Sequence, residues 1–363
     1  MSRILPTSLT RGYISRWTVS DAVRELIQNA LDIGDYNFET TTCSITIESF
    51  GGTIDIKNLL LGQGTKTNDS SKLGGFSEGL LLALLICARD NVDIEFINGD
   101  KTWKPIFDYN GDFGCECLYI EEDDADDVHD GVKITLNLDS STVSDIVDRT
   151  LHLQDEYEKH ETAYGEILLN EEHSGKIFVG GLFISRFDSK YGFNFHPEDF
   201  PLDRDRKSLQ PFDIKWRVKD MWAEVAVDAD EDTADDIVDS IVKRDDSFEH
   251  TYEHSLQTES VIKSAEKLYN NKYSGKLVVS DWKEAKSLEK AGNINVELVN
   301  NQKLVSLIQK SESYKTVVLG KIEPKDESIP ALLEEFEDKY YNDMSSDMLR
   351  DWEELKDKVL QEV

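Results

Sequence analysis

The segment AVRELIQNALD (residues 22–32) holds the residues whose types and spacing are best suited to chemistry. Glu25 and Asn29 stand four residues apart, and Asp32 follows three residues later. On a helix these three polar side chains share one face. A carboxylate can take a proton from an attacking water, and a carboxamide oxygen is a hard ligand for Mg²⁺. The spacing is therefore typical of a phosphate-handling site, although an amphipathic helix with a solvated polar face explains it as well.

A helix over residues 18–33 must hold this group, and its other side is apolar enough to pack against a sheet. The apolar positions on that side are Ala22, Val23, Leu26, Ile27, Ala30 and Leu31. Their spacing follows the period of a helix, which predicts that this side is buried.

Two glycine-containing segments further along are suited to binding phosphate. The first is GTK, at Gly64, Thr65 and Lys66, and the second is KLGGFSEG at residues 72–79, which opens an apolar helix over 79–90. Glycines ahead of a helix let backbone N–H groups approach a phosphate, and the helix N-terminus favours an anion. A flexible loop with a surface lysine explains these segments equally well.

Length and charge limit the classes to which the chain can belong. A chain of 363 residues forms about two or three domains. The net charge of −33 argues against direct nucleic-acid binding, because Lys and Arg bind the phosphate backbone. An acidic surface keeps a protein soluble, and it could also dock on a basic protein partner or imitate nucleic acid.

We expect a cytoplasmic protein that does not enter a membrane. No apolar run reaches the roughly 18 residues of a membrane span, and residues 1–17 have no signal-peptide core. The four cysteines form no disulfide framework, so we expect reduced thiols.

Hydrophobic periodicity predicts an α/β protein throughout. In the first part of the chain, strands are expected over 43–50, 92–99, 115–122 and 132–138, and the acidic stretch 121–131 is expected to be a solvated loop. A helix over 141–154, a strand hairpin over 176–187 with a Gly-Gly turn, and a helix ending near Val227 follow.

The acidic run DADEDTADD (228–236) indicates a domain boundary. Beyond it, strands over 276–280 and 296–299 alternate with helices over 281–291 and 301–311, and a helical acidic tail follows. We therefore expect domains over 1–140, 141–227 and 228–363.

The order of the glycine and helix motifs resembles that of the GHKL ATPases. Their heat-shock members, the ninety-kilodalton chaperones, carry E-L-x-x-N-x-x-D, then S-G-T-K, then I-G-x-F-G-x-G-F. This chain has ELIQNALD, GQGTK and LGGFSEGL in the same order, and GVKITLNL (131–138) resembles the strand that closes their nucleotide domain. Proteins of this layout, some of them phage-encoded, form a closer group for comparison.

One further match lies outside the first domain. PEDFPLDRDRKSLQ (197–210) resembles the middle-domain segment of the chaperones whose arginine reaches the γ-phosphate, and Arg206 occupies that position. A guanidinium can bind a phosphate at two points and stabilise the charge that develops during transfer. An ion pair with Asp203 or Asp205 is the alternative role for Arg206.

The chain departs from the family pattern where the adenine is read. The family's D-x-G-x-G box is replaced by IESFGGTID (47–55), in which Glu48, Ser49 and Asp55 are the candidate substitutes. The threonine that follows glycine in the closing strand is Val132 here. Nucleotide preference is therefore open.

The resemblance implies a Bergerat-type α/β sandwich over 1–140, followed by a transducer-like domain. It also implies a slow Mg²⁺-dependent ATPase that switches the state of a protein partner. Glu25 would activate water and Asn29 would hold Mg²⁺, with Asp32 beside them. Arg206 would engage the γ-phosphate. The backbone segments that would bind the nucleotide contain Gly64, Thr65, Lys66, Gly74, Gly75, Phe76 and Gly79.

By analogy with related ATPases, an N-terminal arm over 1–17 would exchange between protomers of a nucleotide-dependent homodimer. The alternative is a non-hydrolysing module of the same fold whose acidic surface binds or inhibits a protein partner. Histidine-kinase activity is disfavoured, because no phosphoacceptor helix with a suitably placed histidine is found.

Overall fold

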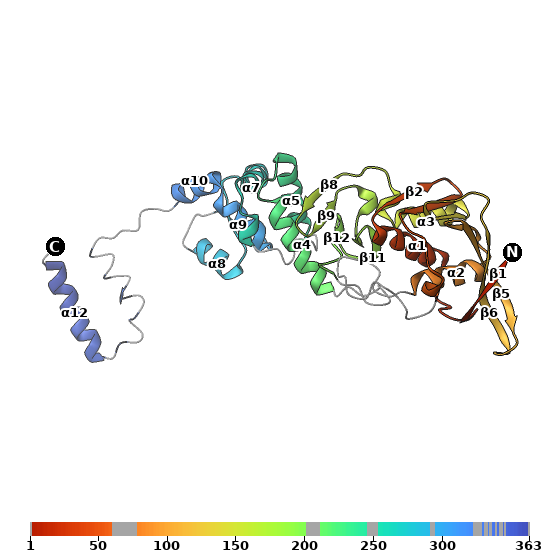
Figure 1. Ribbon diagram of the computed structural model, residues 1–363. Coiled ribbons are helices and arrows are strands. Elements are labelled where there is room, and N and C mark those ends of the chain that lie inside the picture. The colour runs from red at the N-terminus through yellow and green to blue at the C-terminus, as the bar shows by residue number, and fades with distance from the viewer. Residues whose placement is uncertain are drawn as a thin grey trace. The chain divides into compact units, whose positions relative to one another are not determined.

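The computed structural model describes residues 2–59, 78–200, 211–244, 253–290, 295–321 and 346–361, with single residues at 329, 333, 336, 337, 340 and 344 (Figure 1). The chain divides into two compact units, Met1–Thr258 and Glu259–Val363. Each unit combines strands with helices, so the predicted α/β class is confirmed.

The first unit begins with a seven-stranded sheet in the order β1-β6-β5-β4-β7-β3-β2, in which neighbouring strands are antiparallel. The strands are β1 (Arg3–Thr10), β2 (Tyr36–Thr40), β3 (Ser44–Phe50), β4 (Asp93–Asn98), β5 (Lys101–Asn110), β6 (Cys115–Asp124) and β7 (Gly131–Asn137). A short 3-10 turn, η1 (Ile56–Leu59), follows β3. The residues predicted for the N-terminal arm thus supply β1, which is the outer strand beside β6.

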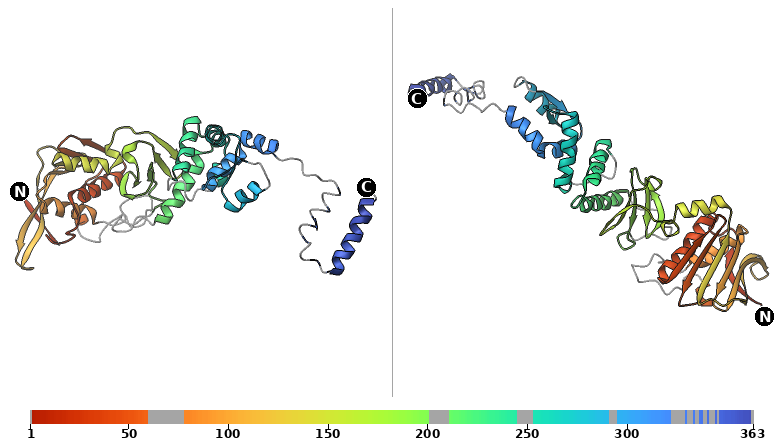
Figure 2. Two further views of the ribbon diagram at one scale, coloured as in Figure 1. Left: turned by 180° about the vertical axis from the view of Figure 1, so that it is seen from behind. Right: turned by 90° about the horizontal axis from the view of Figure 1, so that it is seen from above.

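Two helices, α1 (Val19–Ile33) and α2 (Gly79–Arg89), cover one face of this sheet (Figure 2). A capping box between Thr18 and Asp21 starts α1, and Gly34 ends it with a φ of 90°. The apolar side of α1 and nearly all of α2 are buried in one core with the sheet. Both predicted helices and the predicted side of burial are confirmed, because spacing and capping signals agree with the packing.

The expectation of a solvated loop over 121–131 is wrong in its first part. β6 continues through Asp124 and pairs with β5, where Lys101 Nζ lies 2.6 Å from Asp124 Oδ1. Cross-strand pairing of opposite charges compensates the acidic residues that argued against a strand.

A second sheet of mixed direction, in the order β11-β10-β12-β9-β8, follows helix α3 (Ser140–Asp148) and the 3-10 turn η2 (Leu151–Leu153). Its strands are β8 (Lys159–Thr162), β9 (Gly165–Leu168), β10 (Lys176–Val179), β11 (Leu182–Arg186) and β12 (Gly192–Phe195), and the 3-10 turn η3 (Glu171–His173) precedes β10. The predicted Gly-Gly hairpin is confirmed, since Gly180 and Gly181 adopt φ values of 56° and 78° between β10 and β11. The helix predicted over 141–154 is shorter than expected and ends at Asp148.

Two helices, α4 (Pro211–Val225) and α5 (Glu231–Lys243), pack near this sheet, and the 3-10 turn η4 (Glu253–Leu256) follows them. The acidic run predicted as a boundary leads directly into α5. This helix lies with the first unit, because Ser240 and Asp236 contact Tyr191 and Lys190 next to β12. The division of the chain therefore falls after Thr258, beyond the expected boundary at 227.

The second unit contains α7 (Glu259–Lys272), β13 (Leu277–Val279), α8 (Trp282–Lys290), β14 (Val296–Leu298), α9 (Gln302–Lys310), α10 (Glu312–Lys321) and α12 (Ser346–Gln361). β13 and β14 are parallel and are joined through α8, which confirms the predicted alternation of strands and helices. Within the described residues, no helix has both the length and the apolar character to span a membrane.

All four cysteines are free thiols. Burial raises the pKa of the Cys87 thiol to about 12, which keeps it protonated and unreactive at neutral pH.

Candidate functional site

The carboxylate of Glu25 is buried at the start of a second helix. Its side chain is part of α1, only 4% of the residue is exposed, and Gly79 is the first residue of α2. A Cβ on residue 79 would overlap Oε2 of Glu25 and lie 3.4 Å from its Cδ. Glycine is therefore the residue that lets this carboxylate approach the N-terminus of α2, where backbone N–H groups and the helix dipole meet.

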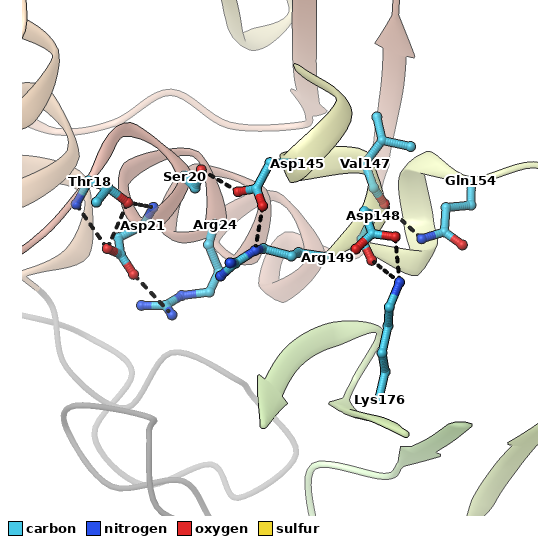
Figure 3. A network of polar contacts seen from close by, with 10 residues as sticks. All are labelled: Thr18, Ser20, Asp21, Arg24, Asp145, Val147, Asp148, Arg149, Gln154 and Lys176. Atoms are coloured by element: carbon cyan, nitrogen blue, oxygen red, sulfur yellow. Dashed lines mark hydrogen bonds and ion pairs between the residues drawn. The ribbon is translucent and has the colours of Figure 1, made fainter. Parts of the chain in front are cut away.

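Arg24 supplies positive charge beside this carboxylate. Its Nη2 lies 3.4 Å from Oε1 of Glu25, and its Nη1 lies 3.5 Å from Oδ1 of Asp21 (Figure 3 shows the pairing with Asp21). The Arg24 side chain is 15% exposed. No motif in the sequence indicated Arg24, although a guanidinium next to a buried carboxylate is suited to binding phosphate.

Asn29 and Asp32 follow on the same face of α1, and both are half-buried. Just beyond the end of α1, the carbonyl of Asp35 accepts a hydrogen bond from the N–H of Phe50, the last residue of β3, over 2.9 Å. The polar face of α1 thus runs from the start of α2 at Glu25 toward the end of β3.

Three buried residues, Ser49, Asn98 and Val132, lie side by side at that end of the sheet. Ser49 on β3 and Asn98 on β4 are both direct partners of Val132 on β7. All three residues are buried, with exposed fractions of 5%, 7% and 4% for Ser49, Asn98 and Val132. Direct partners on neighbouring strands share a face, so this row lies beneath the helices.

Asn98 holds the segment that follows β3. Its Oδ1 accepts a hydrogen bond from the N–H of Ile54 over 2.7 Å, and its Nδ2 donates to the carbonyl of Ile54 over 2.9 Å. The sequence analysis missed Asn98, because only the strand register shows that it lies beside Val132.

The structure separates the three candidate substitutes for the adenine-reading aspartate. Glu48 alternates with Ser49 along β3 and bonds Asn37 and Lys133, and these contacts hold the pKa of Glu48 below its usual range. Asp55 is exposed and pairs with Lys57 over 3.0 Å. Ser49 alone faces the buried side.

Gln28, on α1, carries a buried amide. Only 1% of the residue is exposed, and neither its Oε1 nor its Nε2 has a hydrogen-bond partner in the part of the chain that the structure describes. The sequence analysis did not single it out. Its position three residues after Glu25 was the one available signal.

Seven of the predicted site residues lie outside the described residues. They are Gly64, Thr65, Lys66, Gly74, Gly75, Phe76 and Arg206. Of the predicted site, the structure therefore places Glu25, Asn29, Asp32 and Gly79, and it brings Glu25 and Gly79 into contact.

A network of polar contacts connects α1 to the second sheet (Figure 3). Ser20 donates to Asp145 of α3 over 3.0 Å, and Asp145 also accepts from Nε of Arg149 over 2.9 Å. Lys176 of β10 is 5% exposed and bonds the carboxylate of Asp148. These contacts, joined to one another through the backbone of α3, connect the start of α1 to the second sheet.

A cavity of about 360 Å³ lies elsewhere in the first unit, between the second sheet and α5. His160, Tyr191, Trp222 and acidic residues of α5 are among the residues that line it. Burial lowers the pKa of His160, while the charges of Asp230 and Asp236 partly oppose this effect. Of the predicted site residues that the structure describes, none lines this cavity.

Within the described ranges, no group of three His, Cys, Asp or Glu side chains is placed to hold a metal ion. A Mg²⁺ ion at Asn29 would therefore need phosphate and water oxygens to complete its six ligands, as is usual for this ion.

No family model matches the sequence. The chain is similar to a protein of Mycoplasma pneumoniae that is described as uncharacterized. The two are 23% identical over 221 residues, which cover 55% of this chain and 88% of the relative. A similarity of this degree carries no activity over to this chain.

Proposed function

We propose that this chain is a GHKL-type protein that binds ATP with Mg²⁺ on the polar face of α1 and hydrolyses the nucleotide slowly. The antiparallel sheet with α1 and α2 on one face is compatible with a Bergerat-type sandwich. The single observation that carries the proposal is the buried Glu25 carboxylate against the first residue of α2.

The residues at the phosphate end fit this ligand. The N-terminus of α2 is suited to an anion, and a side chain at position 79 would fill the space that Glu25 now enters. Arg24 adds a cation at this point, and Gln28 adds a buried amide that has no protein partner among the described residues. A phosphate would satisfy groups that the described protein leaves only partly paired.

Each residue then has a distinct role. Glu25 takes a proton from the attacking water, Asn29 offers its carboxamide oxygen to Mg²⁺, and Asp32 adds a carboxylate further along the same face. Arg206 and the glycine segments around Gly64 and Gly74 would bind the phosphates. When bound, Mg²⁺ supplies charge that offsets the negative charge of the phosphates.

We further propose that nucleotide state alters how the chain engages a protein partner. The contacts from Ser20 through Asp145 and Arg149, and between Asp148 and Lys176, support a coupling between α1 and the second sheet. A switch of this kind requires two arrangements that the ligand favours unequally. β1 at the outer edge of the sheet is a candidate for exchange in a nucleotide-dependent homodimer.

The residues expected near the adenine base favour a second candidate function, a non-hydrolysing module that binds a protein partner. Ser49 is the one buried candidate substitute for the adenine-reading aspartate, and Val132 replaces the threonine that the resemblance expects. A serine is too short to replace a buried aspartate in the same geometry, and an unpaired base amine would cost about 1–3 kcal/mol. Loss of base recognition would leave the fold intact and the nucleotide weakly bound.

Titration with ATP and Mg²⁺, followed by measurement of phosphate release, separates these functions. The wild type is compared with Glu25→Ala, and Glu39→Ala on exposed β2 serves as the matched control. Release that is lost only in Glu25→Ala, with binding retained, supports the ATPase. The absence of both binding and release rejects the ATPase and supports the module.

A further inference from the structure

The side chain of Gln28 is buried although the helical period places it away from the apolar side of α1. Val23, Ile27 and Ala30 are among the residues that pack α1 into the core. Gln28 is placed on the opposite side by the helical period, and yet it is 1% exposed. Burial on this side therefore needs an explanation other than packing on the sheet.

Both polar atoms of this amide lack a hydrogen bond to the described part of the protein. An amide can donate two hydrogen bonds and accept two. Buried polar groups are nearly always satisfied, so an unsatisfied one in a folded protein points to strain, catalysis, or a water or ion that binds there. A ligand for this position must offer an acceptor and a donor together.

The neighbours of Gln28 along the helix indicate what kind of ligand would bind this amide. Gln28 follows Arg24 by four residues and Glu25 by three, and it precedes Asp32 by four. Side chains at these spacings are adjacent on a helix surface. Gln28 therefore belongs to the same polar stripe as the carboxylate that we assign to the activation of water.

We propose that Gln28 positions the attacking water against the terminal phosphate of the nucleotide, an inference that rests on the proposed function. Its Oε1 accepts a hydrogen bond from the water, and its Nε2 donates to an oxygen of the γ-phosphoryl group. Glutamine orients the attacking water in this manner in some other nucleotide hydrolases.

The reaction balances without a further reactant. The water oxygen forms a bond to the γ-phosphorus, and the bond from that phosphorus to the bridging oxygen breaks, so that ADP leaves. Glu25 receives the proton from the water. Gln28 keeps its protons and acts only through position.

The test replaces Gln28 by an apolar side chain of similar size in the full chain. Gln28→Met is the first variant, and Gln28→Leu is the second in case the first does not fold. Gln309→Met is the matched control, because its amide is buried in part and donates to the carbonyl of Val278 over 3.1 Å. Phosphate release, the Kd of a non-hydrolysable ATP analogue, and the melting temperature without nucleotide are measured for each.

We expect kcat to fall by about tenfold or more in the Gln28 variants. The Kd of the analogue should rise by a smaller factor, because only one of the two proposed hydrogen bonds of Gln28 is made to the nucleotide. The melting temperature without nucleotide is expected to stay constant or rise, because the variants remove a buried unpaired amide. Gln309→Met should keep kcat and lower the melting temperature.

Three results would overturn the proposal. A kcat within about twofold of the wild type excludes a role in positioning water. A lower melting temperature with a loss of activity that only follows the folded fraction shows a structural role. If the wild type itself releases no phosphate, the proposed function fails and this inference fails with it, whereas the first two results leave the proposed function standing.

Discussion

Two glutamines in the first unit have opposite surroundings. Gln154 donates from Nε2 to the carbonyl of Val147 over 2.7 Å, and its Oε1 accepts from Nε2 of His173 over 2.8 Å. Gln28 makes neither kind of bond with the described residues. The amide of Gln154 thus connects α3 to η3, the turn before β10, whereas the amide of Gln28 is unsatisfied by the described residues.

The hydrogen bonds of a buried polar group indicate whether it serves the fold or a ligand. A saturated amide lowers the energy of the folded chain by itself, so its role is complete without a ligand. An unsatisfied amide raises that energy until a partner arrives. We therefore assign Gln154 to structure and Gln28 to ligand binding, and the following predictions test that division.

The largest effect is expected for Gly79→Ala. The added Cβ would overlap Oε2 of Glu25 and force the carboxylate away from the start of α2. Phosphate release should fall by about 100-fold, in the range seen when a general base is displaced. Gly111→Ala is the control, since a Cβ there meets nothing within 4 Å. Equal activity in both variants would show that Glu25 is not part of the site.

The next effect distinguishes the two amides directly. Gln154→Met leaves the carbonyl of Val147 and Nε2 of His173 without their partner, and unfolding in urea should show a loss of about 1–3 kcal/mol. Gln28→Met should show no loss without nucleotide. Similar losses for both variants would contradict the proposed difference between the two residues.

The dependence of folding stability on pH should report on His173, the partner of Gln154. Burial lowers the pKa of His173, with Lys176 acting in the same direction and Glu172 and Asp148 opposing it. The folded state therefore binds this proton less readily than the unfolded state does. Stability should fall as pH decreases below about 6.5, the ordinary pKa of histidine, toward the lower folded pKa. Urea unfolding from pH 8 to about pH 5 measures this slope.

The variant His173→Gln removes the titrating group and should flatten the slope. His160, whose pKa is also lowered by burial, should contribute to the slope that remains. A slope unchanged by His173→Gln would show that His173 is not the buried neutral group described here.

The smallest effect is expected at the surface part of the network between α1 and α3. Asp145→Ala removes bonds to Ser20 and Arg149, and the Asp145 side chain is 45% exposed. Exposed pairs of this kind contribute about 0–1 kcal/mol. Asp239→Ala, which breaks the exposed pair with Lys243, is the matched control. A larger effect of Asp145→Ala on nucleotide turnover than on unfolding would indicate that this network couples α1 to the second sheet.

Local patterns in the sequence identified the elements that position the site. The helical spacing around Glu25 predicted α1 and its buried side, and the apolar run after Gly79 predicted α2. The Gly-Gly pair predicted the hairpin between β10 and β11. These features depend on residues close together in the chain, so the sequence alone was sufficient for them.

Other features depended on contacts that no local pattern contains. The chain continued β6 through acidic residues because β5 supplies Lys101 opposite Asp124. Helix α3 ended at Asp148, whose carboxylate pairs with Lys176 of β10. Residues 231–243 joined the first unit through contacts with Lys190 and Tyr191.

The sequence by itself determined that Glu25, Asn29 and Asp32 share a helix face, because the period of a helix fixes which side chains are neighbours. Only the tertiary structure decided that Glu25 meets Gly79 and that Ser49 and Asn98 flank Val132. It also decided that Gln28 is buried with no hydrogen bond to the described residues. The physical reason is that strand register, close approach between helices and burial arise from residues far apart in the chain. Such contacts form only when the whole core packs.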